Sequence, residues 1–145
     1  MKVQQRDIVE LNYELPNGKF KAHPALIISN SNVLETEDIF YAVMISSNPM
    51  NEEFNFELEN SMLTKPLSKK SFIKCQLIQS YSTDEVILRI SSLNQITFDK
   101  VLKKIFETVF KSILYTLIIK HLAQQRYPQA GRHGAASAVV FAVQL

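Results

Sequence analysis

Up to about residue 96, short apolar runs alternate with polar, turn-forming stretches along the chain. The runs cover residues 7–13, 23–28, 39–45, 54–58, 72–78 and 86–90. Runs of this length, bounded by Pro, Gly, Asn and Ser, are typical of β-strands. Residues 54–58 alternate apolar and polar positions, which indicates a strand with one exposed face. Five to six strands of this kind predict a small, closed antiparallel sheet.

The stretch 23–30, His-Pro-Ala-Leu-Ile-Ile-Ser-Asn, is the centre of this pattern. Its apolar part lies between turn residues and predicts a strand that is buried on both faces. His23 stands at the mouth of that strand, and strand ends on a rigid scaffold are where ligands often bind. Downstream, residues 33–38 form an acidic connection to the next apolar run.

Beyond residue 97 the apolar period changes from two to three or four residues. The apolar positions are Phe98, Val101, Leu102, Ile105, Val109, Ile113 and Leu117. This spacing predicts a long amphipathic C-terminal helix, with Thr97 as its N-cap and Asp99 in its first turn. The apolar stripe is wide, so it needs a partner surface, either the sheet or a second subunit.

The composition fits one globular domain in a reducing compartment. The chain has 145 residues, a net charge of +2 and a single cysteine, Cys75, which excludes an internal disulfide and which we expect in the core. This charge neither establishes nor excludes nucleic-acid binding. The N-terminus does not resemble a signal peptide, and charges interrupt the apolar stretch 105–123, so we expect a cytoplasmic protein without a membrane span.

The last part of the chain differs in composition from the rest. Residues 124–145 are rich in Ala, Val, Gly and Arg, whereas the upstream chain is rich in Lys, Asn, Glu and Ile. We therefore expect a single domain over 1–123 and an atypical tail over 124–145, which is as consistent with a non-native extension as with native sequence. We assign no function to that tail.

Two motifs in order carry a resemblance to a known family. Asp7-Ile8-Val9, a Gly-containing loop and the stretch 23–30 resemble the PemK/MazF toxin pattern Gly-Asp-Ile-Val, loop, Arg-Pro-Ala-Leu-Val-Ile-Ser-Asn. Three further segments, 45–47, 67–75 and 90–93, match the family in order and spacing. The resemblance covers roughly residues 5–112.

The resemblance implies a mainly β (α+β) fold: a small SH3-like antiparallel barrel of the MazF/CcdB type with a long C-terminal helix. It also implies a homodimeric toxin that cleaves single-stranded RNA without a metal or other cofactor and is silenced by a cognate antitoxin peptide. The chain departs from the family pattern at four positions. His23 replaces an arginine, Ser46 a threonine, Arg6 a glycine and Gln79 a basic residue.

Metal-free RNA cleavage needs a base for the 2′-hydroxyl, donors for the phosphorane and an acid for the leaving oxygen. His23 titrates near neutral pH and can act as acid or base, and Ser46 can donate to a phosphate oxygen. We therefore predict His23 and Ser46 as catalytic residues. For RNA binding we predict Lys19, Phe20 and Lys21 in the loop before His23, and Lys74, because single strands bind to positive charge combined with aromatic rings. Tyr81 is a further stacking candidate.

Other interpretations of the same residues stay open. A lone histidine at a strand start is often structural, Ser46 is also a turn residue, and the Lys19–Lys21 loop can be an ordinary solvated hairpin. The missing arginine and the missing basic residue at Gln79 favour a second hypothesis, a catalytically degenerate MazF/CcdB-like protein that binds an antitoxin or gyrase. Of the two, we favour the endoribonuclease.

Overall fold

The computed structural model describes residues 2–14 and 17–126, and the chain divides into two units, one up to Val109 and one from Phe110. The elements of the first unit are β1 (Asp7–Glu14), β2 (Phe20–Ile27), α1 (Ser31–Glu37), β3 (Ile39–Ser46), β4 (Asn55–Leu58), β5 (Ser71–Ser82), β6 (Val86–Ser92) and α2 (Gln95–Ile105). The second unit contains α3 (Ile113–Arg126).

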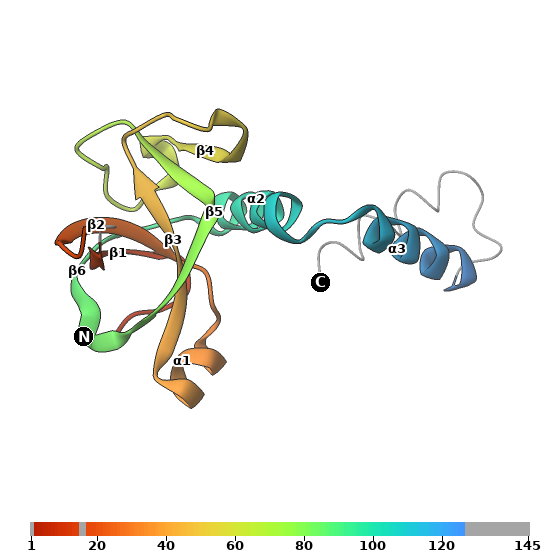
Figure 1. The fold of residues 1–145 in the computed structure, drawn as a ribbon, viewed down its shortest axis with the longest axis horizontal. Helices are drawn as coiled ribbons and strands as arrows, with labels where there is room; N and C mark the ends of the chain where they lie inside the picture. The colour runs from red at the N-terminus through yellow and green to blue at the C-terminus, as the bar shows by residue number, and fades with distance from the viewer. Residues whose placement is uncertain (1, 15–16, 127–145) are drawn as a thin grey trace. The chain divides into compact units, whose positions relative to one another are not determined.

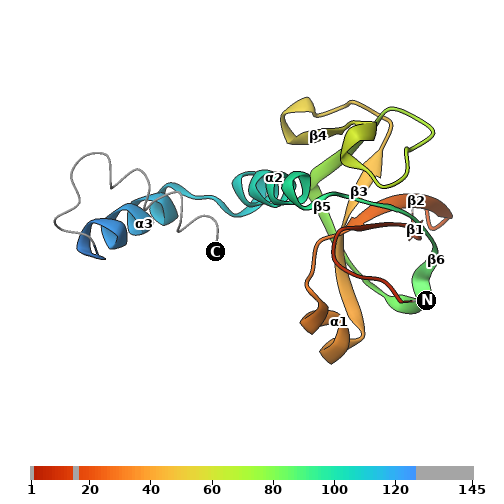
Figure 2. The same ribbon diagram turned by 180° about the vertical axis from the view of Figure 1, so that it is seen from behind.

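The six strands form one antiparallel sheet in the order β4-β5-β3-β2-β1-β6 (Figures 1 and 2). Each predicted apolar run became a strand, and the predicted α+β fold class is confirmed. Side chains that alternate along β2 enter two different cores: Leu26 on one face, Ala25 and Ile27 on the other. The predicted burial of this strand on both faces is therefore confirmed.

The larger core lies between the sheet and α2, which runs beside β5 in both views (Figures 1 and 2). Its buried residues are Ile8, Leu26, Val43, Ile45, Leu58, Ile73, Cys75, Leu93, Phe98, Val101 and Ile105. The smaller core, on the other face, contains Val3, Val9, Leu11, Ala25, Ile27, Phe40 and Ala42. The prediction that Cys75 belongs to the core is confirmed, and burial raises the pKa of its thiol to about 11.

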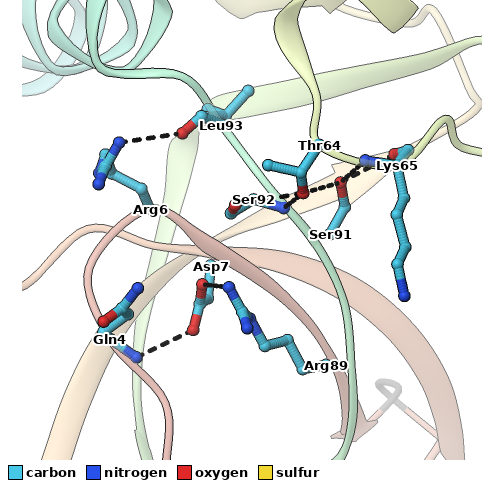
Figure 3. A network of polar contacts seen from close by, with 9 residues as sticks. All are labelled: Gln4, Arg6, Asp7, Thr64, Lys65, Arg89, Ser91, Ser92 and Leu93. Atoms are coloured by element: carbon cyan, nitrogen blue, oxygen red, sulfur yellow. Dashed lines mark hydrogen bonds and ion pairs between the residues drawn. The ribbon is translucent and has the colours of Figure 1, made fainter.

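The predicted closure of the sheet is only partial, because β4 and β6 remain its two edges. β4 has four residues and leads directly into a 3₁₀ turn, so the ladder cannot continue along it. Instead, residues 62–65 meet residues 91–94 through one bridge, Leu63 with Leu93, and through a bond from Thr64 N to Ser92 O at 2.9 Å. We call this junction, together with Arg6, Asp7 and Arg89 beside it, the seam; Figure 3 shows its hydroxyl contacts among Thr64, Ser91 and Ser92.

The start of β1 fastens the same region. Arg6 has a φ of 76°, and its backbone donates to Ile27 O and accepts from Leu93 N, both at 3.0 Å. The next residue, Asp7, is 1% exposed and forms an ion pair with Arg89 at 2.8 Å (Figure 3). Its second oxygen accepts from the backbone of Gln4 at 3.1 Å. One ion pair and one backbone hydrogen bond therefore hold this buried carboxylate.

The predicted long helix is wrong in two respects. Its N-cap is Asn94, whose side chain accepts from the backbone N–H of Thr97 at 2.8 Å, so Thr97 already lies in the first turn. The α-helix also ends at Ile105 and passes into a π-helical turn over Phe106–Phe110. The core accounts for this end, because Ile105 is buried whereas Val109, one turn later, is 44% exposed.

The predicted acidic connection over 33–38 contains a short helix, α1. The Asn30 side chain caps it by accepting from Val33 N at 3.3 Å, and Asp38 ends it with a φ of 53°. Figure 1 shows α1 and β4 at opposite ends of β3. The expected tail over 124–145 lies outside the described residues from 127 onward. Within residues 2–14 and 17–126, no helix is long and apolar enough to cross a membrane.

Candidate functional site

The two predicted catalytic residues lie on neighbouring strands. The β2–β3 ladder reaches Ala25 with Met44, so His23 lies two residues beyond it on β2 and Ser46 lies two residues beyond it on β3. The backbone of Ile45, next to Ser46, interacts with the His23 ring, which agrees with this placement. On its other side His23 pairs with Leu11 of β1. The imidazole therefore lies near the end of β3, next to the residue that precedes Ser46.

The surroundings of His23 favour its neutral form. The side chain is half-buried, and burial, followed by the positive charge of Lys21, lowers its pKa below the ordinary value of 6.5, although the Ile45 backbone acts in the opposite direction. The Tyr13 ring meets the imidazole edge-on, with ring centroids 5.9 Å apart and planes at 77°. A neutral, oriented imidazole at pH 7 is equipped to accept a proton.

The residues before His23 form an exposed, positively charged hairpin. Lys21 lies two residues from His23 along β2 and shares its face, since alternate strand residues point the same way. Lys19 follows Gly18, whose φ of 74° makes the turn, and its backbone donates to Asn17 Oδ1 at 3.1 Å. Phe20 is 68% exposed. The predicted set Lys19, Phe20 and Lys21 is therefore accessible to a ligand at the mouth of β2.

Ser46 is held by the loop that follows it. Its Oγ accepts a hydrogen bond from the backbone of Asn48 at 3.2 Å. A serine oxygen that accepts in this way still carries its own proton, which can be donated to another group. The hydroxyl is thus oriented by the protein while its donor capacity remains for a phosphate oxygen.

Lys74, the fourth predicted RNA-binding residue, lies in a different environment. Its side chain is buried, and its ammonium donates to Asn48 O at 2.5 Å, Met50 O at 2.8 Å and Asn55 Oδ1 at 2.9 Å. An ammonium has three donors, so these acceptors use all of them. We therefore leave Lys74 out of the RNA-binding set. No sequence signal indicated this role, because strand alternation places Lys74 on the face opposite its core neighbours Ile73 and Cys75.

Tyr13 is a site residue that the sequence analysis missed. The sequence signal for Tyr13 was its position two residues after Leu11. Alternate residues of a strand share a face, so Tyr13 lies on the same face of β1 as Leu11, which pairs with His23. Tyr81, named only as a stacking candidate, donates from its hydroxyl to Gln79 Oε1 at 2.7 Å. Burial, then Tyr13 and Glu85, raise the pKa of the Tyr81 phenol, so the two tyrosines are close enough to interact.

A separate open groove of about 640 Å³ lies along α2. None of the predicted site residues lines it. Its lining includes Phe54 and Phe56 together with Lys100, Lys103 and Lys104 of α2. For metal binding, the described part of the chain contains no group of three or more His, Cys, Asp or Glu side chains arranged to hold an ion.

Solved structures similar to this chain are toxins and toxin–antitoxin complexes. An endoribonuclease in complex with its cognate antitoxin from a mycobacterial species has a TM-score of 0.61 at 14% identity, covering 73% of this chain and 93% of that chain. A MazE–MazF complex of Deinococcus radiodurans has a TM-score of 0.62 at 14% identity, covering 76% and 98%. A MazF toxin of Mycobacterium tuberculosis has a TM-score of 0.58 at 16% identity, covering 70% and 94%.

At these identities the structural likeness shows the fold, and no curated protein sequence matches the chain. The sequence profile of one family, however, matches residues 4–109, which is most of the chain and includes all of the sheet and α2. That family is described as the PemK-like, MazF-like toxins of type II toxin–antitoxin systems. The chain therefore belongs to the PemK/MazF-like toxin family.

Proposed function

We propose that this toxin is a metal-independent endoribonuclease that cleaves single-stranded RNA at the site formed by His23 and Ser46. The observation that carries the proposal is a half-buried imidazole with a lowered pKa that interacts with the backbone of Ile45, the residue before the positioned Ser46 hydroxyl. Support comes from the similar solved structures, two of which are named endoribonucleases. The family arginine supplies a fixed charge, whereas His23 supplies a base and leaves the charge to Lys21.

In the proposed reaction, neutral His23 takes the proton from a ribose 2′-hydroxyl. The 2′-oxygen then forms a bond to the adjacent phosphorus, and the bond from phosphorus to the 5′-oxygen breaks. Ser46 Oγ–H and the Lys21 ammonium stabilise the negative charge that develops on the phosphate oxygens. The departing 5′-oxygen takes a proton from water. The products are a 2′,3′-cyclic phosphate and a 5′-hydroxyl end.

The hairpin before His23 suits a single strand rather than a duplex. Lys19 and Lys21 are exposed cations that can neutralise successive phosphates, and the exposed Phe20 ring lies between them for a base to stack on. Duplex bases are already stacked on each other and offer no such face. We infer that cleavage occurs in unpaired RNA.

The experiment is cleavage of a fluorogenic single-stranded RNA in excess EDTA, with the product end identified by mass spectrometry. The expected result is a 2′,3′-cyclic phosphate formed by the wild type and by a Lys69→Met control, and lost in a His23→Ala/Ser46→Ala double variant. Equal cleavage by wild type and double variant would reveal a contaminating nuclease. An inactive wild type at all pH values tested would overturn the proposal.

For partners, we infer a cognate antitoxin and a second copy of this chain, in the cytoplasm where the RNA is found. Similar structures include MazE–MazF complexes, which supports the antitoxin. A dimer is supported by exposed apolar side chains, Val109 in the first unit and Leu117, Ile118 and Leu122 in the second. Of the predicted stripe, Val101 and Ile105 are instead covered by the protein's own core, and Ile113 lies outside the described side chains. A monomeric mass by light scattering at micromolar concentration would exclude the dimer.

A further inference from the structure

The loop 47–54 joins β3 to β4 and begins directly after Ser46. Lys74 of β5 holds this loop by hydrogen bonds. The Lys74 ammonium reaches two backbone carbonyls of this loop, Asn48 O and Met50 O, and the side chain of Asn55 at its end. The lysine side chain is 6% exposed. One buried cation therefore bonds at once to the first half of the loop and to Asn55, the residue that follows the loop.

Asn55 completes the attachment from the first residue of β4. It pairs with Lys74 in the β4–β5 register, gives its oxygen to the ammonium, and donates from Nδ2 to Pro49 O at 2.9 Å and Met50 O at 3.4 Å. Within the loop, Asn48 Oδ1 accepts from Met50 N at 3.0 Å. The loop carbonyls from 48 to 50 are thus all bonded to Lys74 or to Asn55.

The chemistry of this cluster indicates that Lys74 holds the loop in place and does not merely fill space in the core. All three partners of the ammonium are neutral oxygens, so no carboxylate offsets the cost of burying its charge. An apolar side chain of similar length would fill the same space at lower cost. What only a lysine provides here is three convergent donors that fix three oxygens relative to one another.

Asn48 connects this cluster to the site. Its carbonyl accepts from Lys74, while its N–H donates to Ser46 Oγ at 3.2 Å. We propose that Lys74 is a positioning residue for the RNA cleavage reaction: through Asn48, it fixes the direction in which the Ser46 hydroxyl donates. The catalytic part of this inference rests on the proposed function, whereas the attachment of the loop does not.

Two measurements separate these parts, and Lys70 offers a matched control. Lys70 also lies over the Phe72 ring, at 5.5 Å against 5.9 Å for Lys74, but it is exposed and pairs with Glu57. The first measurement is hydrogen–deuterium exchange of peptides spanning residues 46–55. We expect Lys74→Met to accelerate exchange in this loop and Lys70→Met to leave it unchanged.

The second measurement is steady-state cleavage of the fluorogenic RNA. Misplaced reacting groups lose rate rather than affinity, so Lys74→Met should lower kcat by about tenfold to hundredfold with little change in KM. In a Ser46→Ala background the same substitution should cost less than about threefold, because the two residues act through one group. Lys70→Met should leave kcat and KM unchanged.

Unchanged exchange in residues 46–55 of Lys74→Met overturns the attachment, and equal kcat losses with and without the Ser46 hydroxyl overturn the coupling to Ser46. If Lys74→Met does not fold, Asn55→Ala, which removes one acceptor and two donors of the same cluster, takes its place with the same expected results. A wild type without RNase activity overturns the catalytic part together with the proposed function, while the exchange comparison still decides the attachment.

Discussion

The candidate site and the seam both contain polar groups at strand ends. The two regions differ in whether these groups are paired within the protein. At the seam, the carboxylate of Asp7 is 1% exposed and both of its oxygens have partners, one of them the Arg89 guanidinium. At the site, His23 is half-buried and Ser46 retains a proton to donate. Buried charges that are paired within the protein hold two parts of the chain together, whereas accessible groups that can still donate or accept a proton can act on a ligand. The comparison assigns stability to the seam and activity to the site.

The largest expected effect tests the site. His23→Ala should lower kcat/KM for RNA cleavage by about 10²–10⁴, which is the usual contribution of a general acid or base, with little change in thermal stability. His23→Arg, which restores the family residue, should retain or raise activity because it adds fixed charge at the phosphate.

Activity and melting temperature of the three proteins are measured side by side. Unchanged cleavage in His23→Ala would remove His23 from the mechanism. An inactive wild type together with an active His23→Arg would identify a toxin scaffold that lost its activity at this position.

The second effect tests the seam. Arg89→Met should lower the free energy of unfolding by about 2–4 kcal/mol, because it leaves the Asp7 carboxylate buried without its counter-charge. Asp7→Asn should cost about 1–2 kcal/mol, since the half-exposed Arg89 can turn to water. Urea unfolding followed by circular dichroism measures both.

The control for the seam is an exposed ion pair on the same sheet. Lys70 and Glu57 are 2.7 Å apart and more than half exposed, so Lys70→Met should change stability by less than about 0.5 kcal/mol. Cleavage per folded molecule should be unaffected in all three variants. A larger loss in Asp7→Asn than in Arg89→Met would contradict the assignment of the buried charge.

The sequence could predict those features that depend on residues close together in the chain. Strand positions were predictable because apolar runs are bounded by nearby turn residues: the run 39–45 became β3, Ile39–Ser46. The choice of His23 and Ser46 as catalytic candidates followed from the family resemblance. Whether they catalyse stays a prediction, because neither register nor burial shows a reaction.

Features that depend on distant segments were not predictable. The burial of Lys74 requires the loop 47–54 to fold back over β5, and the ion pair of Asp7 with Arg89 joins residues far apart in the sequence. The end of the α-helix at Ile105 likewise reflects where the core ends, since the apolar period itself continues. In each case tertiary contacts decided between options that local patterns left open.

The third prediction concerns the pH dependence of the site. A general base works when deprotonated, so kcat/KM should fall tenfold per pH unit below the pKa of His23, with an inflection below 6.5 because that pKa is lowered. Lys21→Met removes one cause of the lowering, so the inflection should move to higher pH. The pH–rate profiles of the two proteins test this directly. A rate that rises on acidification would instead make His23 the general acid.

The fourth prediction separates charges that meet RNA from those that do not. Each phosphate neutralised on a single strand contributes about 0.7 to the slope of log affinity against log salt, so replacing both Lys19 and Lys21 by Met should reduce the slope by up to about 1.4. Lys69→Met, an exposed control, should leave it unchanged. Binding of an uncleavable 2′-O-methyl RNA, followed by fluorescence anisotropy, gives the slopes. Equal slopes for wild type and double variant would exclude both lysines from the interface.

The smallest effect returns to the seam, where Arg6 has a φ of 76°. That conformation costs a side chain with a Cβ roughly 1 kcal/mol, and glycine, the residue of the family pattern, adopts it freely. Arg6→Gly removes this strain, but it also removes a weak hydrogen bond from Arg6 Nη1 to Leu93 O at 3.4 Å. In addition, glycine raises the conformational entropy of the unfolded chain. Arg6→Ala removes the bond and keeps the strain, so it is the matched control. We expect Arg6→Gly to be more stable than Arg6→Ala by about 0.5–1 kcal/mol in urea unfolding. The opposite order would mean that the seam, and not the residue, sets the cost of this conformation.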